Sequence, residues 1–237
     1  MRIYFLHHSS VAARIGKTLL IFDHYQDKPG GRIKDGVVHA EDIRRAGRVY
    51  VFVSHAHHDH YNKRIFEWAK YNSNVTYILD PTVPEHDRPA GAVVLGRTET
   101  YGDGHVDVQA FGSTDIGGSF FVQCGGKRIF HAGDLNDWHW KDESDEKYVR
   151  GMKKFFDREL HLLASCVDAI DVAFFPVDKR MGSGYDEGAL AFINKMHPKV
   201  FIPMHFVDFE DTQVFAKKTN DSGTRVLRIK RNGQRLI

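Results

Sequence analysis

The chain has 237 residues, enough to bury one sizeable core, and we expect a single domain over residues 1–237. Its lysines and arginines (33) nearly balance its aspartates and glutamates (31), so the net charge of +2 gives no reason to expect a nucleic-acid partner. No apolar run approaches the ~20 residues of a membrane helix, and the apolar start is too short for a signal peptide. We therefore expect a cytoplasmic protein without a membrane partner, and the oligomeric state stays open.

The first half of the chain alternates short strand-like runs with turn residues. A hairpin is expected where Gly16 and Lys17 separate two such runs. Val49–Val53 is a continuous apolar run typical of a buried strand, and a helical pattern follows over Lys63–Tyr71. The elements predicted for this half are strands Arg2–Leu6, Val11–Ile15, Thr18–Phe22, Val49–Val53 and Val75–Leu79, and helices Ala40–Ala46 and Lys63–Tyr71.

The second half repeats this rhythm of strands and helices. Amphipathic patterns predict a long helix and a shorter one that Asp186 caps. Two successive blocks of strands followed by helices favour an α/β fold, a four-layer αβ/βα sandwich of two facing mixed β-sheets with outer helices. The elements predicted for this half are strands Val106–Phe111, Ser119–Cys124, Arg128–His131, Val172–Phe175 and Val200–Pro203, and helices Asp145–Ser165 and Glu187–Met196.

Histidine stands out in the composition, with 15 copies, whereas the two cysteines lack the C-x-x-C spacing of a thiolate metal site. His55, His57, Asp59 and His60 occur within six residues, directly after a predicted buried strand, where α/β sheets place ligand sites. Imidazoles and a carboxylate suit Zn²⁺, Mn²⁺ or Fe. We expect His55 and His57 on one metal and Asp59 and His60 on a second, because so short a loop cannot bring all four to one ion. A solvated histidine-rich loop is the alternative.

The run H-A-H-H-D-H at residues 55–60 resembles the H-x-H-x-D-H signature of the metallo-β-lactamase superfamily. Two later motifs of that family appear in order, a strand ending in G-D at Asp134 and a late strand followed by His205. The resemblance implies the metallo-β-lactamase fold, with Asp134 bridging two metals and His205 completing the second metal site. The implied metal ligands are His55, His57, Asp59, His60, Asp134 and His205.

The N-terminal F-L-H-H-S-S followed by L-L-I-F-D looks like the G-H-A…D-P opening of the branch that includes L-ascorbate-6-phosphate lactonase. This similarity extends the resemblance over most of the chain. It implies that His8 and Asp23 lie at the edge of the cleft, with His8 as a substrate contact. It also favours a phosphorylated or otherwise anionic small-molecule substrate.

One feature of the family pattern is missing. The family usually supplies a third histidine to the first metal between these motifs, whereas this chain reads V-Q-A-F-G-S-T-D-I-G-G there. Three replacements stay open: the carboxylate of Asp115, the imidazole of His139, or water. The number of bound ions, one or two, stays open with them.

Several residues near these motifs have both a functional and a structural interpretation. His58 occupies the variable position of the first motif and is expected to point away from the metals. Trp138 and Trp140 either line the substrate pocket or anchor their loop. His139 and Lys179 are candidate substrate contacts, and for Lys179 and its charged neighbours simple solvation is the alternative.

Together these residues predict a metal-dependent hydrolase that uses a metal-bound hydroxide, with Zn²⁺ as the expected ion and Mn²⁺ or Fe as alternatives. Asp134 and Asp59 are the catalytic candidates, Asp134 as the bridge between metals and Asp59 as a proton shuttle. The expected bond is an ester, a lactone or a phosphodiester. Two other functions remain open: a catalytically degenerate metal-binding or regulatory module, and a di-iron oxidoreductase.

Overall fold

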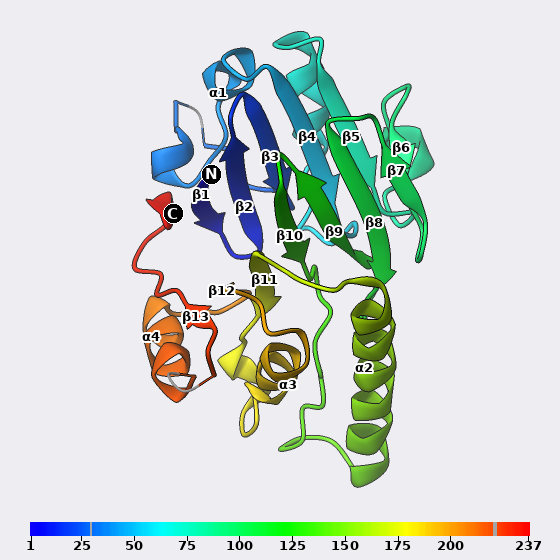
Figure 1. The fold of residues 1–237 in the computed structure, drawn as a ribbon, viewed down its shortest axis with the longest axis vertical. Coiled ribbons are helices and arrows are strands. Elements are labelled where there is room, and N and C mark those ends of the chain that lie inside the picture. The colour runs from blue at the N-terminus through cyan, green and yellow to red at the C-terminus, as the bar shows by residue number, and fades with distance from the viewer. Residues whose placement is uncertain (29, 220–221) are drawn as a thin grey trace. The chain divides into compact units, whose positions relative to one another are not determined.

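The computed structural model describes residues 1–28, 30–219 and 222–237. The chain divides into two compact units, each with its own seven-stranded sheet (Figure 1). Unit 1 comprises Met1–Gly96 and Lys230–Ile237, and unit 2 comprises Arg97–Ile229. Among the described residues no helix is both long and apolar enough to cross a membrane. The α/β class and the two mixed sheets are confirmed, and the single domain over residues 1–237 remains a prediction.

Unit 1 is rich in β-structure. Its elements are β1 (Arg2–His7), β2 (Ser10–Ile15), β3 (Thr18–Phe22), β4 (Arg48–Val53), β5 (Val75–Leu79), β6 (Val93–Val94), β14 (Gln234–Arg235), α1 (Ala40–Arg44), and the 3₁₀ helices η1 (Ile33–Asp35), η2 (Lys63–Lys70) and η3 (Glu85–Asp87). The strand order is β14-β1-β2-β3-β4-β5-β6. The pairings from β14 to β3 are antiparallel, and those from β3 to β6 are parallel.

Unit 2 carries the longer helices. Its elements are β7 (Thr100–Gly102), β8 (Val106–Gly112), β9 (Gly118–Cys124), β10 (Lys127–His131), β11 (Val172–Pro176), β12 (Val200–Met204), β13 (Arg225–Val226), α2 (Glu146–Cys166), α3 (Glu187–Met196), α4 (Phe209–Lys218) and the 3₁₀ helix η4 (Lys179–Met181). The strand order is β13-β12-β11-β10-β9-β8-β7. The pairings from β7 to β10 are antiparallel, and those from β10 to β13 are parallel.

The two sheets therefore follow the same plan, three antiparallel pairings followed by three parallel ones. Parallel neighbours end at the same edge of a sheet, and such edges carry ligand sites in α/β proteins. In unit 1 this edge is formed by the ends of β3, β4 and β5, and in unit 2 by the ends of β10, β11 and β12. The loops that leave these two edges contain the residues predicted to bind metal.

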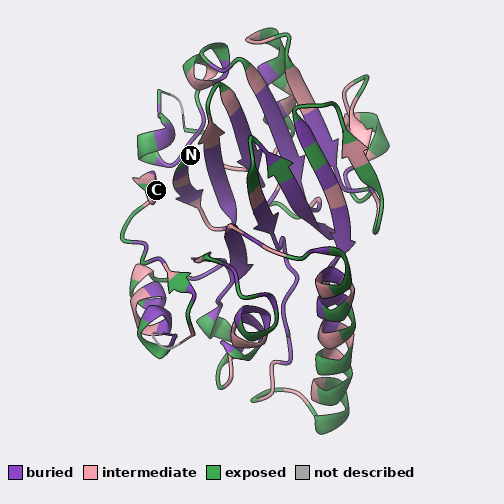
Figure 2. Cartoon of the chain, viewed as in Figure 1, coloured by how far each residue is buried: buried purple, intermediate pink, exposed green. Residues whose placement is uncertain are grey.

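Each sheet is anchored by a core of large apolar side chains, and the central strands are buried along most of their length (Figure 2). In unit 1 the rings of Phe22 and Phe52 stack with centroids 4.5 Å apart. In unit 2 the ring of Phe192 on α3 lies 4.6 Å from that of Phe175 and 5.4 Å from that of Phe130. Burial of one such ring contributes roughly 1.5–3 kcal/mol. The strand ends that carry the site are therefore held on rigid supports.

Candidate metal centre

The polar network of unit 1 begins at the adjacent ends of β3 and β4. Asp23 follows β3, and Ser54 and His55 follow β4. Asp23 is 1% exposed, and its carboxylate accepts hydrogen bonds from the Ser54 backbone N–H (2.7 Å) and from Ser54 Oγ (2.6 Å). A buried carboxylate is expensive unless its oxygens are hydrogen-bonded, and these two bonds meet that requirement. Asp23 is thereby a fixed anchor for the histidines beside it.

Two imidazoles attach to this anchor through the same ring nitrogen. His60 Nδ1 lies 2.8 Å from Asp23 Oδ2. His55 Nδ1 lies 3.0 Å from Ser54 Oγ, whose own hydrogen goes to Asp23. Because both partners act as acceptors, each imidazole carries its hydrogen on Nδ1 and presents a lone pair at Nε2. A carboxylate that holds the far nitrogen in this way is the usual support of a metal-binding histidine.

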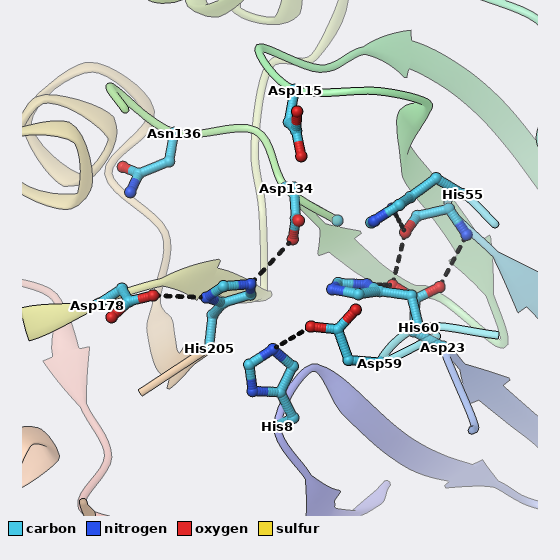
Figure 3. A network of polar contacts seen from close by, with 12 residues as sticks. His8, Asp23, His55, Asp59, His60, Asp115, Asp134, Asn136, Asp178 and His205 are labelled. Atoms are coloured by element: carbon cyan, nitrogen blue, oxygen red, sulfur yellow. Dashed lines mark hydrogen bonds and ion pairs between the residues drawn. The ribbon is translucent and has the colours of Figure 1, made fainter. Parts of the chain in front are cut away.

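A second carboxylate of unit 1, Asp59, lies against His8, with 3.4 Å between Asp59 Oδ2 and His8 Nε2 (Figure 3). Donor atoms of His8, Asp59 and His60 lie within 4.8 Å of one another, close enough to hold one ion. The hydrogen bond with His8 is the largest influence on the pKa of Asp59, and it keeps that pKa well below its usual value although burial acts in the opposite direction. Asp59 is therefore ionised at neutral pH, as a ligand must be.

The remaining histidines of the motif differ in their surroundings. His57 is exposed, and its ring lies 4.7 Å from that of His55, nearly perpendicular to it. His58 is 97% exposed, in agreement with its expected orientation away from the site. We call His55, His57, Asp59 and His60 the unit 1 cluster.

Unit 2 repeats the arrangement at the ends of its own parallel strands. Asp134, Asp178 and His205 follow β10, β11 and β12 in turn. His205 Nδ1 lies 2.9 Å from Asp178 Oδ2, and His205 Nε2 lies 3.6 Å from Asp134 Oδ1 (Figure 3). The Asp178 carboxylate therefore fixes the hydrogen on Nδ1, and the Nε2 lone pair faces the side of Asp134.

Asp178 is charged in spite of its position. Its side chain is 0% exposed, and burial alone would raise its pKa. Hydrogen bonds from His205 and Arg180 outweigh burial and lower the pKa of Asp178 to about 2. The guanidinium of Arg180 donates hydrogen bonds to the Asp178 carboxylate from Nε (2.9 Å to Oδ1) and from Nη2. Asp178 was only one of several charged residues noted after β11, and the structure gives it a specific partner.

Asp115 lies in the exposed loop between β8 and β9, and one of its carboxylate oxygens lies within 4.8 Å of a carboxylate oxygen of Asp134. We call Asp115, Asp134 and His205 the unit 2 cluster. All three line a pocket of unit 2 with a volume of about 280 Å³, together with Thr114, Trp138, Trp140, Tyr148, Met152, Asp178 and Arg180.

Two candidate contacts have other partners. His139 is 1% exposed, accepts a hydrogen bond from the Lys141 N–H at Nδ1 (3.1 Å), and donates from Nε2 to the carbonyl of Gly184 (3.0 Å). Both ring nitrogens are occupied, so His139 offers neither a metal lone pair nor a substrate contact, contrary to expectation. Lys179 forms an ion pair with Asp211 (2.8 Å) and is not among the residues that line the pocket.

Three of the residues described above have a strained backbone. His8, Asp23 and His205 adopt left-handed φ values of 52°, 45° and 62°. Residues other than glycine rarely take this conformation, which costs about 1–3 kcal/mol each and persists where the surroundings enforce it. The strain sits at the strand ends that turn these three side chains toward their partners.

Several supporting residues could not be assigned from the sequence. Ser54 precedes the histidine motif and links His55 to Asp23, but a lone serine carries no signal of that role. Trp138 donates from Nε1 to the Asp134 carbonyl (2.7 Å), and its ring lies 5.3 Å from that of His205. The sequence left Trp138 as a pocket residue or an anchor, and its contacts and lining position fit both.

Known proteins resemble this chain over nearly its whole length. A UPF0173 metal-dependent hydrolase of Symbiobacterium thermophilum is 27% identical over 237 residues, covering 94% of this chain and 93% of that protein. The structure of a novel metallo hydrolase from Ignicoccus hospitalis aligns with a TM-score of 0.68 at 17% identity, covering 99% and 97% of the two chains. The metallo-β-lactamase fold protein YhfI of Bacillus subtilis aligns with a TM-score of 0.62 at 11% identity, covering 98% and 97%. No protein-family model matches the chain.

The fold is that of the metallo-β-lactamases, and with it the resemblance found in the histidine motif is confirmed. The sequence is similar to those of UPF0173 metal-dependent hydrolases from two organisms, over 94% of this chain in each case.

Proposed function

We propose that the unit 1 and unit 2 clusters act together as one metal centre with two ions. One observation carries this proposal: His55, His60 and His205 are all held through Nδ1, by Ser54, Asp23 and Asp178 respectively. Core packing alone does not require three imidazoles to share one tautomer and to leave the same nitrogen, Nε2, without its hydrogen. The sequence motifs support the same grouping, because they are the motifs that supply one shared centre in this fold.

The donor set suits particular metals. Imidazole nitrogens and carboxylate oxygens without thiolates favour Zn²⁺, Mn²⁺ or Fe. His55, His57 and Asp115 would hold one ion, Asp59, His60 and His205 the other, and Asp134 would contact both. When bound, the ions acidify the attacking water and polarise the bond under attack.

Two residues of the chain, Asp59 and His8, would hold and transfer the proton. Asp59 Oδ2 lies 3.4 Å from His8 Nε2, so a hydrogen bond with the imidazole as donor and the carboxylate as acceptor would let this pair deliver a proton to the leaving group. Because the pKa of Asp59 is lowered, its carboxylate binds that proton only weakly. We therefore assign His8 the role of holding the proton, in addition to its expected contact with the substrate.

The bond attacked is proposed to be an ester, a lactone or a phosphodiester of a small substrate that carries an anionic group. Arg180 lines the pocket with a half-exposed guanidinium, and we assign it the anionic contact first expected of Lys179. Asp178 holds Arg180 and His205 at once, so it couples the position of this contact to the position of a metal ligand.

Restoring the metal tests this function. Protein stripped with a chelator is reloaded with Zn²⁺, Mn²⁺ or Fe²⁺ and assayed on an aryl ester, a lactone and an aryl phosphodiester. At least one ion is expected to restore hydrolysis of at least one substrate class. A protein that holds its metal yet hydrolyses none of them would instead be a degenerate binding module, and the proposal would fail.

The metal content of Asp115→Ala tests the third ligand. Loss of one carboxylate ligand should lower the affinity for one ion, so the variant is expected to retain fewer ions per chain after dialysis than the wild type. Asp168→Ala, which removes an exposed carboxylate outside the pocket, is the matched control and should retain the wild-type content. An unchanged content in Asp115→Ala would remove Asp115 from the ligand set.

A further inference from the structure

The pocket of unit 2 has an apolar side that the metal chemistry does not use. Its members are Trp138 and Trp140 from the loop after β10, and Tyr148 and Met152 from α2. Tyr148 and Met152 are four residues apart on the helix and so share one face. Tyr148 is 46% exposed, and its hydroxyl donates to the Trp138 carbonyl (3.4 Å).

The two tryptophans differ in how they are held. Trp138 is 8% exposed and fixed by its hydrogen bond to the Asp134 carbonyl, so it positions the metal ligands. Trp140 is half-buried, and its ring lies nearly parallel to that of Trp138, with centroids 6.5 Å apart and planes at 16°. Its backbone has a φ of 42°, a strained value for a tryptophan. The surrounding loop therefore keeps Trp140 in the pocket wall although the left-handed backbone conformation of this residue is unfavourable.

We propose that this wall receives a flat aromatic ring next to the bond to be hydrolysed, so that the substrate is an aromatic ester, lactone or phosphodiester. The proposal rests on the proposed hydrolase function. The half-buried indole of Trp140, stacked on that of Trp138, offers a flat face suited to stacking. The pocket volume of about 280 Å³ exceeds the ~150 Å³ cavity that accepts benzene, which leaves room for one ring and the group under attack.

A quaternary ammonium group is the other ligand that aromatic walls recognise. It is usually enclosed by aromatic faces on several sides, as in an aromatic cage. Trp138 is 8% exposed and stacks with Trp140, so the two indoles offer one face between them, which favours a ring. Asp115, Asp134 and Asp178 make the lining acidic, but our proposal commits the first two to metal and the third to Arg180.

Binding without turnover tests the pocket by itself. Zn²⁺-loaded protein labelled with ¹⁵N is titrated with benzamide, with cyclohexanecarboxamide as the saturated match, and with tetramethylammonium, while the indole N–H signals are followed. Benzamide is expected to shift the signal of Trp140 and to bind about 2- to 10-fold more tightly than the saturated amide. Trp68, which belongs to unit 1, is the internal control and should not shift.

Turnover tests the link to chemistry. Benzyl acetate and cyclohexylmethyl acetate have similar leaving groups and differ in the flatness of the ring. The metal-loaded enzyme is expected to show a higher kcat/KM for the benzyl ester, and Trp140→Ala should reduce that preference about 2- to 10-fold, mainly through KM. A preference that survives in Trp140→Ala overturns the proposal.

The outcomes separate the two proposals. Selective benzamide binding without hydrolysis of any ester supports the aromatic pocket and contradicts the hydrolase function. Hydrolysis together with equal binding of the two amides supports the hydrolase function and contradicts the aromatic pocket. A Trp140 shift that is larger with tetramethylammonium than with benzamide would identify a cation site and overturn the aromatic assignment.

Discussion

Replacing His57 by alanine is expected to lower metal-supported hydrolysis by more than about 100-fold, beyond the 10- to 100-fold loss typical of removing an outer partner of a ligand. His57 is exposed, so its removal leaves no cavity in the core, and the fold should survive. The neighbouring His58→Ala is the matched control, because His58 belongs to the same loop but is 97% exposed. It should retain nearly full activity.

The measurement is kcat/KM together with metal content for both variants under equal metal concentrations. Full activity in His57→Ala would contradict the assignment of the histidine motif. A loss of similar size in His58→Ala would show that the loop as a whole, not the ligand, matters. Unfolding curves for both proteins separate either result from a loss of structure.

Asp178→Asn is expected to weaken metal binding by about 10- to 100-fold, the range seen when the carboxylate behind a metal-binding histidine is removed. The neutral amide no longer favours the Nδ1 hydrogen of His205, which then loses its fixed orientation. Asp211→Asn is the control, because Asp211 is also a buried carboxylate, paired with Lys179, and lies outside the pocket. It should lose stability without losing metal affinity.

Isothermal titration of Zn²⁺ into each metal-free protein gives the affinities, and denaturant unfolding gives the stabilities. Equal metal affinity in Asp178→Asn and the wild type would contradict the role of Asp178 as the support of His205. A loss of the same size in Asp211→Asn would mean that any buried carboxylate in this unit has that effect.

Local sequence patterns predicted most of the central strands of both sheets. The β2–β3 hairpin and the buried strand β4 follow from alternation, glycine placement and a continuous apolar run. The return of β14 to pair with β1 could not be predicted, because that pairing joins residues more than 200 positions apart. The helix expected over Lys63–Tyr71 forms as the 3₁₀ helix η2.

The sequence motifs predicted the candidate donor residues but not the residues that hydrogen-bond to them. Asp178 and Ser54 are ordinary residues in the sequence. The end of a neighbouring strand brings Asp178 to His205, whereas Ser54 precedes His55 directly and is oriented by Asp23 at the end of the neighbouring strand β3. His139 illustrates the reverse case. A histidine near the motif is a reasonable ligand candidate, yet a backbone N–H and a carbonyl occupy its two nitrogens. Such pairing depends on loop conformation, which composition does not determine.

Anomalous diffraction from crystals of the Zn²⁺- or Mn²⁺-loaded protein tests the central claim most directly. The account predicts ions bound jointly by the two clusters, with Nε2 of His55, His60 and His205 as ligands and Asp134 in contact with both ions. Ions held by one cluster alone, or histidines that coordinate through Nδ1, would contradict it.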